Sequence, residues 1–167
     1  MRKVYLFISV LLLSFLMAGC LFSSESAKIG EVTGSKTDEE AIREVVNAYL
    51  QEINNYSWDT YDKTKGLEFW TEDGKNDLLN DKNKLPNLEK SIKENQISRQ
   101  FTKNQIIKVT IESTTATVEA VALASSTSIN PNFVGGMQSQ EKITMSKVDN
   151  KWRIADRSAQ VMVMQSE

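Results

Sequence analysis

Few residues of this 167-residue chain could do chemistry, because it contains one cysteine and no histidine. Without histidine, the chain cannot form a Ser-His-Asp triad or a histidine-ligated zinc site. An enzyme built on this chain would therefore have to rely on Asp, Glu, Lys or Tyr. Asp156 is the candidate base, and the Tyr49 hydroxyl is the candidate hydrogen-bond donor to a developing negative charge. The single thiol, Cys20, is a candidate for covalent modification.

Cys20 follows a segment typical of an exported protein. Two basic residues at positions 2 and 3 precede an uncharged apolar run over 4–16, and Ala18 and Gly19 stand directly before Cys20. This order predicts an export signal whose apolar run is too short to span a membrane stably. The segment resembles the lipobox of bacterial lipoproteins. The resemblance implies that 1–19 is a signal peptide and that Cys20 becomes an N-terminus carrying a diacylglyceryl thioether. An ordinary signal peptide or an N-terminal membrane anchor is the alternative.

The resemblance also implies a location. Two or more acyl chains hold a protein stably on a membrane, so we expect a lipid-anchored protein on the cell membrane that faces outside the cytoplasm. Leu21 is not the aspartate that retains lipoproteins at the inner membrane, which implies the outer membrane in a cell that has two. Residues 20–36 would then form the lipidated cysteine and a flexible tether, rich in Ser, Gly, Lys and Glu, with a reach of about 20 to 24 Å.

Charge and spacing exclude several kinds of partner. Loss of the leader would leave 18 basic and 22 acidic side chains, a formal charge of −4, which gives no reason to expect nucleic acid as a partner. The acidic stretch 71–86 fits no calcium loop, since a loop that begins at Asp73 places Lys84 at the twelfth position, where a glutamate must chelate. Loops that begin at Asp77 or Asp81 fail in the same way. We therefore expect no metal and no cofactor.

The first helix has the clearest signals in the chain. Thr37 and Glu40 are spaced as a capping box at its start, and Asn54 and Asn55 mark its end. Between them, apolar side chains recur at steps of three and four, which predicts one continuous stripe against a core: Ile42, Val45, Val46, Tyr49, Leu50 and Ile53.

Two further helices are expected before the strands begin. Ser57 would cap a second helix that carries aromatic side chains from Trp58 to Trp70. The polar stretch 71–86 is expected to be a loop or a frayed helix. A third helix would begin after Pro86, with Asn87 as its cap and with Leu88, Ser91 and Ile92 on its inner side.

From Ile107 onward the apolar period changes to two, which predicts four strands. Their expected ranges are 107–112, 116–127, 138–148 and 151–161. Asp149 and Asn150 provide a tight hairpin turn between the last two. Alternation along the final strand places four side chains on one face: Trp152, Ile154, Asp156 and Ser158.

This order of elements resembles the nuclear transport factor 2-like superfamily, a cone-shaped α+β fold. The likeness is carried by the Asn54-Asn55 helix end, by Trp58 and by the Asp149-Asn150-Lys151-Trp152 hairpin. It implies a single domain over 37–167, in which N-terminal helices pack on a curved antiparallel sheet of about four strands. In this superfamily the sheet wraps the first helix and closes over a pocket. A cystatin-like helix-on-sheet arrangement is the alternative fold.

Two functions stay open at this point. The first is a non-catalytic binding or accessory module at the cell envelope, with an envelope protein or a small-molecule ligand as partner. The alternative is a small-molecule enzyme of the proton-transfer isomerase or dehydratase type, with Asp156 as base and Tyr49 as donor. A solvent-connected cavity of about 300 Å³ or more that contains both side chains would favour the enzyme. The apolar tail over 161–164 either continues the sheet as an edge strand or meets another chain.

Mass spectrometry of the native protein tests the anchor. We expect its N-terminal peptide to begin at Cys20 and to carry the added mass of acyl chains, because the resemblance places cleavage directly before that residue. Recovery of a soluble, unlipidated form, or of one that retains its leader, would contradict the anchor.

Overall fold

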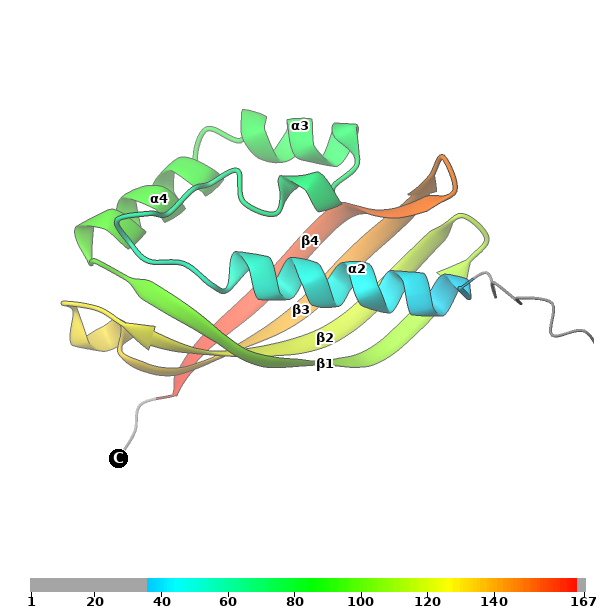
Figure 1. Cartoon of the computed structure of the whole chain (residues 1–167). Coiled ribbons are helices and arrows are strands. Elements are labelled where there is room, and N and C mark those ends of the chain that lie inside the picture. Colours follow the sequence, from blue (N-terminus) through cyan, green and yellow to red (C-terminus); the bar gives the residue numbers. More distant parts are fainter. Residues whose placement is uncertain (1–35, 165–167) are drawn as a thin grey trace, which may run out of the picture. The chain divides into compact units, whose positions relative to one another are not determined.

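The computed structural model describes residues 36–164, which run from helices into strands (Figure 1). The helical elements are α2 (Asp38–Ile53), the short 3-10 helix η1 (Leu67–Phe69), α3 (Glu72–Asn80) and α4 (Lys84–Glu94). The strands are β1 (Ser98–Glu112), β2 (Thr115–Thr127), β3 (Gly135–Val148) and β4 (Lys151–Met164), with the 3-10 helix η2 (Pro131–Phe133) before β3. The α+β class and the four antiparallel strands are confirmed. The expectations for the leader, for Cys20 and for the tether up to residue 35 lie outside the described residues.

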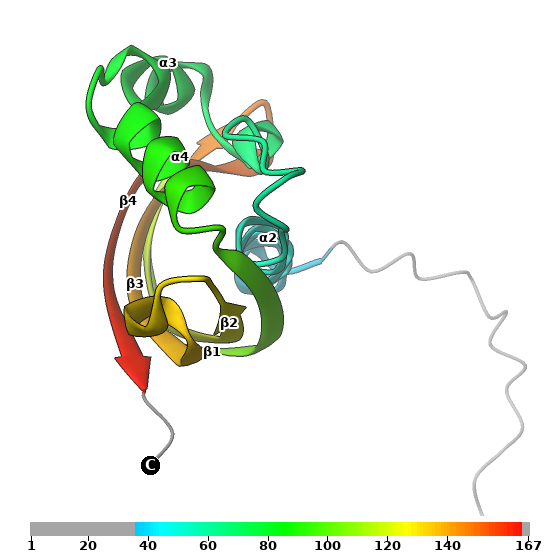
Figure 2. The same ribbon diagram turned by 90° about the vertical axis from the view of Figure 1, so that its left-hand side faces the viewer.

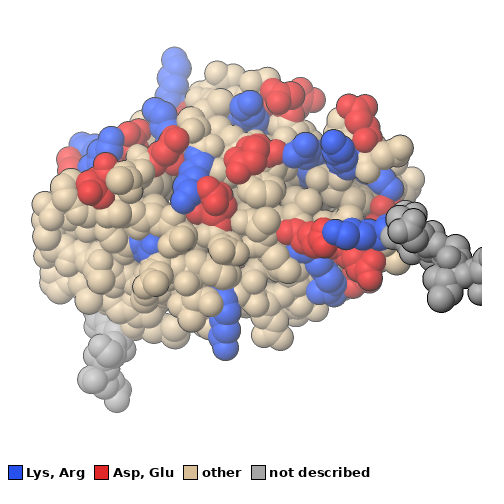
Figure 3. All heavy atoms as spheres, in the orientation of Figure 1, with Lys and Arg blue, Asp and Glu red and all other residues tan. Residues whose placement is uncertain are grey.

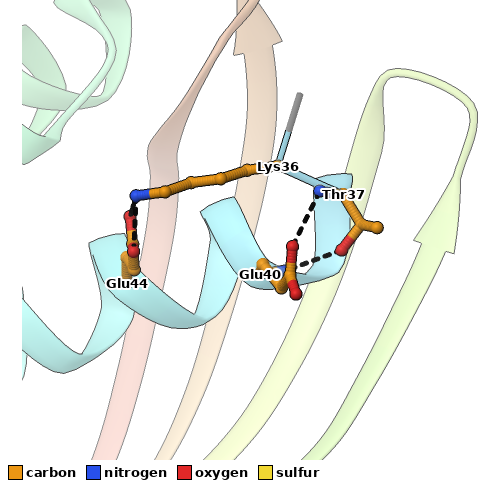
Figure 4. Close-up of polar contacts among 4 residues, drawn as sticks. All are labelled: Lys36, Thr37, Glu40 and Glu44. Carbon is orange, nitrogen blue, oxygen red and sulfur yellow. Dashed lines mark hydrogen bonds and ion pairs between the residues drawn. The ribbon is translucent and has the colours of Figure 1, made fainter. Parts of the chain in front are cut away.

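Helix α2 begins and ends where its sequence signals predict. The Thr37 hydroxyl accepts from the Glu40 amide at 3.3 Å, and the Thr37 amide donates to the Glu40 carboxylate at 2.9 Å (Figure 4). The Lys36 ammonium reaches along the same helix to Glu44 at 2.6 Å. Most of the expected apolar stripe is buried: Ile42, Val46, Tyr49 and Leu50.

The four strands form one antiparallel sheet in the order β1-β2-β3-β4, and the helices lie on one face of it (Figure 2). Asp149 and Asn150 form the turn between β3 and β4, and their φ angles of 49° and 61° both fall in the left-handed region that a two-residue hairpin requires. The inner face of the sheet and the stripe of α2 share one core, whose fully buried sheet residues are Val118, Ile143, Met145 and Ile154. Across residues 36–164, no helix combines the length and the apolar character needed to cross a membrane.

The start of α2 is bonded to the last hairpin of the sheet. The Asp38 carboxylate accepts hydrogen bonds from the Lys147 ammonium at 2.6 Å and from the Trp152 indole at 3.0 Å. These two hydrogen bonds hold the pKa of Asp38 below its usual value. The first helix is therefore held along its length by its apolar stripe and at its start by this junction.

The expected second helix, from Ser57 to Trp70, is wrong. The Asp62 carboxylate accepts from the amide and the hydroxyl of Thr64, and Gly66 has a φ of 82°, so the chain turns where a helix would continue. Tyr56 forms a bridge with Arg99 at the start of β1 instead of leading into a helix. Only the single turn η1 is helical in this stretch.

The stretch 71–86, expected to be a loop or a frayed helix, contains the helix α3, and the helix expected after it is α4. Thr71 caps α3, where its hydroxyl accepts from the Gly74 amide at 3.1 Å. Helix α4 begins at Lys84 rather than after Pro86, which is allowed because a proline in the first turn gives up no helical hydrogen bond. Ile92 is buried as expected and Leu85 is buried with it, whereas Leu88, which was expected on the inner side, is exposed.

Strand β1 starts at Ser98, well before the alternating pattern that predicted it. Its pairing with β2 shifts register between Ile106 and Lys108. The shift changes which side chains face the core, so Ile106 and Val109 pack against it and Ile107 is 61% exposed. Strands β2, β3 and β4 contain the ranges expected for them.

Gly74 sets how closely α3 approaches β4, which yields a test. A Cβ added at Gly74 would lie 2.4 Å from the Ala155 carbonyl oxygen. Alanine normally stabilises a helix interior relative to glycine, but here we expect Gly74→Ala to lower the free energy of unfolding by about 1 to 3 kcal/mol, because the backbone must shift. Urea unfolding measures the change, with exposed Asn76→Ala on the same helix as control. A stabilised Gly74→Ala protein would contradict this packing.

Candidate functional site

A bulge in β4 decides which polar side chains face the core. Met145 pairs with Ile154 and Thr144 pairs with Asp156, so Ala155 is an extra residue in β4. Alternation is therefore broken after Ile154. Asp156, which alternation places on the inner face, is exposed, and this prediction is wrong.

Arg157 takes the inward position that was expected for Asp156. Its Nε and Nη2 atoms donate to the two carboxylate oxygens of Glu141 on β3, at 2.8 and 2.9 Å. The Glu141 side chain has no exposed surface, whereas that of Arg157 is 26% exposed. This is a bidentate ion pair on the inner face of the sheet, in which the guanidinium neutralises the buried carboxylate.

Tyr49 lies beside this pair rather than beside Asp156. The Arg157 guanidinium is 5.8 Å from the centre of the Tyr49 ring. Phe69 and Trp70 contact the same ring edge-on, each at 6.1 Å between ring centres. Burial raises the pKa of Tyr49, so its phenol is protonated at neutral pH. The structure places Tyr49 in the core as expected but does not bring it together with Asp156.

A cavity of about 150 Å³ lies between α2, α4 and the sheet, with Tyr49 in its wall. This volume is half of the about 300 Å³ that would favour the enzyme, and Asp156 does not line the cavity. Asp156 lines a separate hollow of about 260 Å³ with Gly74 and Asp77 of α3. Four aromatic side chains line the Tyr49 cavity together with aliphatic ones: Tyr49, Tyr56, Tyr61 and Trp70.

Five basic side chains also line this cavity, against one carboxylate, that of Asp62. Lys63 and Lys65 have acidic partners, in Glu89 at 3.5 Å and Glu52 at 3.6 Å. Arg157 is held by Glu141, as described above. The other two form no ion pair with any described residue: Lys84 and Arg99.

Arg99 is the most constrained of these cations. Its backbone exchanges hydrogen bonds with Tyr56 at 2.8 and 2.9 Å, and its guanidinium lies 5.5 Å from the centre of the Tyr56 ring. Its Nη1 donates to the side-chain oxygen Oδ1 of Asn54 at 3.2 Å, and the side-chain Nδ2 of Asn54 donates in turn to the Leu50 carbonyl. The Arg99 Nε is buried and has no hydrogen-bond partner among the described residues. A buried donor of this kind normally has an acceptor.

The cavity phenols add no negative charge of their own. Tyr56 and Tyr61 meet edge-on, with ring centres 5.1 Å apart. Burial raises the pKa of Tyr61 to about 12 and also raises that of Tyr56, so both are neutral near pH 7. No group of three or more acidic, cysteine or histidine residues within 36–164 is arranged to hold a metal ion.

Sequence reasoning missed Glu141, Arg157 and Arg99. Alternation counted forward from Trp152 gives Arg157 the wrong face, because a bulge leaves no mark in the pattern of apolar residues. Arg99 lies in a polar stretch that precedes the alternating residues of β1. The one available signal was the aromatic concentration between Tyr56 and Trp70, of which Tyr56, Tyr61 and Trp70 line the cavity.

A double-mutant cycle tests the ion pair. We expect Arg157→Met alone to lower the free energy of unfolding by on the order of 3 kcal/mol, because it leaves the Glu141 carboxylate buried without a partner. Glu141→Leu combined with Arg157→Met should cost much less, since no buried charge remains. Urea unfolding of Glu141→Leu, of Arg157→Met and of the double variant measures the coupling. Additive losses would contradict the pairing.

Comparison with known proteins shows a likeness in structure. No protein-family model matches the chain, and no curated protein matches it. Among solved structures, the intermembrane space region of the chloroplast protein ARC6 is similar, with a TM-score of 0.50 and 15% sequence identity. The match covers 75% of this chain and 98% of that one. At this identity the likeness concerns the fold alone.

Proposed function

We propose that this chain is a lipid-anchored, non-catalytic binding module that faces outside the cytoplasm and has a nuclear transport factor 2-like domain. Its ligand is a small carboxylate with an apolar body of about one ring, bound in the Tyr49 cavity. The lipobox resemblance around Cys20 supports the anchor, and the wrapping of α2 by a four-stranded antiparallel sheet supports the fold. The membrane is then a partner through the acyl chains, and nucleic acid is not a partner.

The buried, unpartnered Nε of Arg99 is the observation that carries the choice of ligand. Tyr56 and Asn54 hold the guanidinium in place before any ligand arrives, so little side-chain entropy is lost on binding. A carboxylate is the acceptor whose geometry matches a guanidinium edge. A ligand carboxylate beside Arg99 in the cavity would satisfy the donor that the described residues leave without an acceptor.

The size and lining of the cavity define the rest of the ligand. A cavity of 150 Å³ is comparable to engineered apolar cavities that bind benzene, so one ring or a branched aliphatic group fits. Tyr56, Tyr61 and Trp70 offer ring edges and faces to such a group. The ligand therefore combines a charged end at Arg99 with an apolar body between α2 and α4.

The positions of the carboxylates support binding over catalysis. Asp156 is exposed and lies outside the Tyr49 cavity, and the buried carboxylate of Glu141 is occupied by Arg157. An essential base must be able to reach its substrate proton. The cavity contains only Asp62 as a carboxylate, and the amide and hydroxyl of Thr64 both donate to it.

Calorimetry with phenylacetate and its uncharged analogue phenylacetamide tests the proposal on the full-length chain in detergent. We expect phenylacetate to bind at least about tenfold more tightly, because a hydrogen bond to a charged group contributes on the order of 1.5 to 3 kcal/mol. Arg99→Met should abolish this preference while retaining apolar contact with Tyr56.

Lys108→Met is the matched control, since it removes the same charge from the same strand outside the cavity. We expect it to leave the preference for phenylacetate unchanged. Equal affinity for both compounds in the unaltered protein, or an equal loss in both variants, would refute the carboxylate site. Circular dichroism confirms that each variant is folded.

A further inference from the structure

The last seven residues of β4, Ser158–Met164, form an exposed sheet edge that we name the β4 edge segment. Strand β4 is the final strand in the sheet order, so only β3 pairs with it. The first half of its outer side is covered, because Trp70 bridges to Ile154 and the Thr71 amide donates to the Ile154 carbonyl at 2.8 Å. Within residues 36–164, no strand or bridge pairs with the outer side of the β4 edge segment.

The β4 edge segment also lacks the usual protection of an edge strand. It contains no charged residue, no proline and no register shift. Strand β1, at the other edge, carries Lys103 and Lys108 and has two register shifts. Charges and irregularities of this kind prevent edge strands from pairing with other chains. The contrast between the two edges indicates that pairing is blocked at β1 and permitted at β4.

Backbone direction identifies the residues available for pairing. The Ile154 carbonyl points away from β3, since it accepts the Thr71 amide. Ile154 and Arg157 both face inward, one on each side of the bulge. In a strand, residues whose side chains share a face also direct their backbone amide and carbonyl groups toward the same edge. Ala159, Val161 and Val163 share the parity of Arg157, so their amides and carbonyls point to the open side.

We propose that two copies of this chain associate by antiparallel pairing of their β4 edge segments, with the two-fold axis at Val161. Val161 then lies opposite its own copy, and Gln160 lies opposite Met162 of the second copy. All facing positions from 158 to 164 are uncharged in this register, so no like charges meet. The two Arg157 side chains are about eight residues apart along the shared edge, roughly 27 Å.

Exposed apolar side chains favour a second copy at this place. Val161, Met162 and Met164 are each close to half exposed, and pairing removes part of this surface from water. The β2–β3 connection adds Ile129 and Val134, both exposed, at the same end of the sheet, where Gly136 pairs with Met164. By contrast, charged side chains gather over α2, α3 and α4 in Figure 3, so the helical side of the domain is poorly suited to apolar association.

Cysteine cross-linking tests the pairing and its register on the full-length chain in detergent. Val161→Cys should form a disulfide-linked dimer on mild oxidation, because residues that face each other across an antiparallel pair have Cα atoms about 5.5 Å apart, within disulfide range. Ile107→Cys is the matched control, because it is an apolar position on β1, away from the β4 edge, that is even more exposed than Val161. It should give no dimer under the same conditions.

Light scattering provides the second measurement. The particle formed by the unaltered chain should have the protein mass of two copies. Val161→Lys should lower this to the mass of one copy, because the substitution places two like charges opposite each other at the axis. Val161 is exposed, so this variant retains its fold. A single-copy mass for the unaltered chain, equal cross-linking of the Ile107→Cys control, or a cross-link only to a different protein would each overturn the proposal.

Discussion

The buried carboxylate of Glu141 constrains much of this structure. It has no exposed surface, and an unpaired charge in that position would be far too costly for a domain of this size. Arg157 meets it with two hydrogen bonds, and it can do so only because the extra residue Ala155 turns Arg157 inward. The bulge and the ion pair therefore require each other.

The same pair links the sheet to the helical layer. Arg157 lies over the Tyr49 ring of α2, and Tyr49 in turn contacts Trp70, whose bridge to Ile154 returns to β4. Arg157 and Tyr49 also form part of the cavity wall. A cavity framed by such contacts has a fixed shape before a ligand enters, which is the condition under which a small pocket can discriminate between ligands of similar size.

Local signals predicted the parts of the fold that local physics determines. The capping box at Thr37, the stripe of α2 and the Asp149-Asn150 turn each depend on residues within a few positions, and all are confirmed. The expected helix after Ser57 is wrong because its residues are held by the distant pairing of Tyr56 with Arg99, which no local pattern reports. The prediction that Asp156 faces the core is wrong for a related reason. A single extra residue in β4 exchanged the roles of two neighbours, Asp156 and Arg157, without changing the apolar pattern.

The junction at Asp38 has a consequence for biosynthesis. The residue that starts the first described helix is bonded to Lys147 and Trp152, which the ribosome adds more than a hundred residues later. Until then, the apolar stripe of α2 has no completed sheet to bury it, and closing so long a loop is slow. The emerging polypeptide therefore stays unfolded through most of translation.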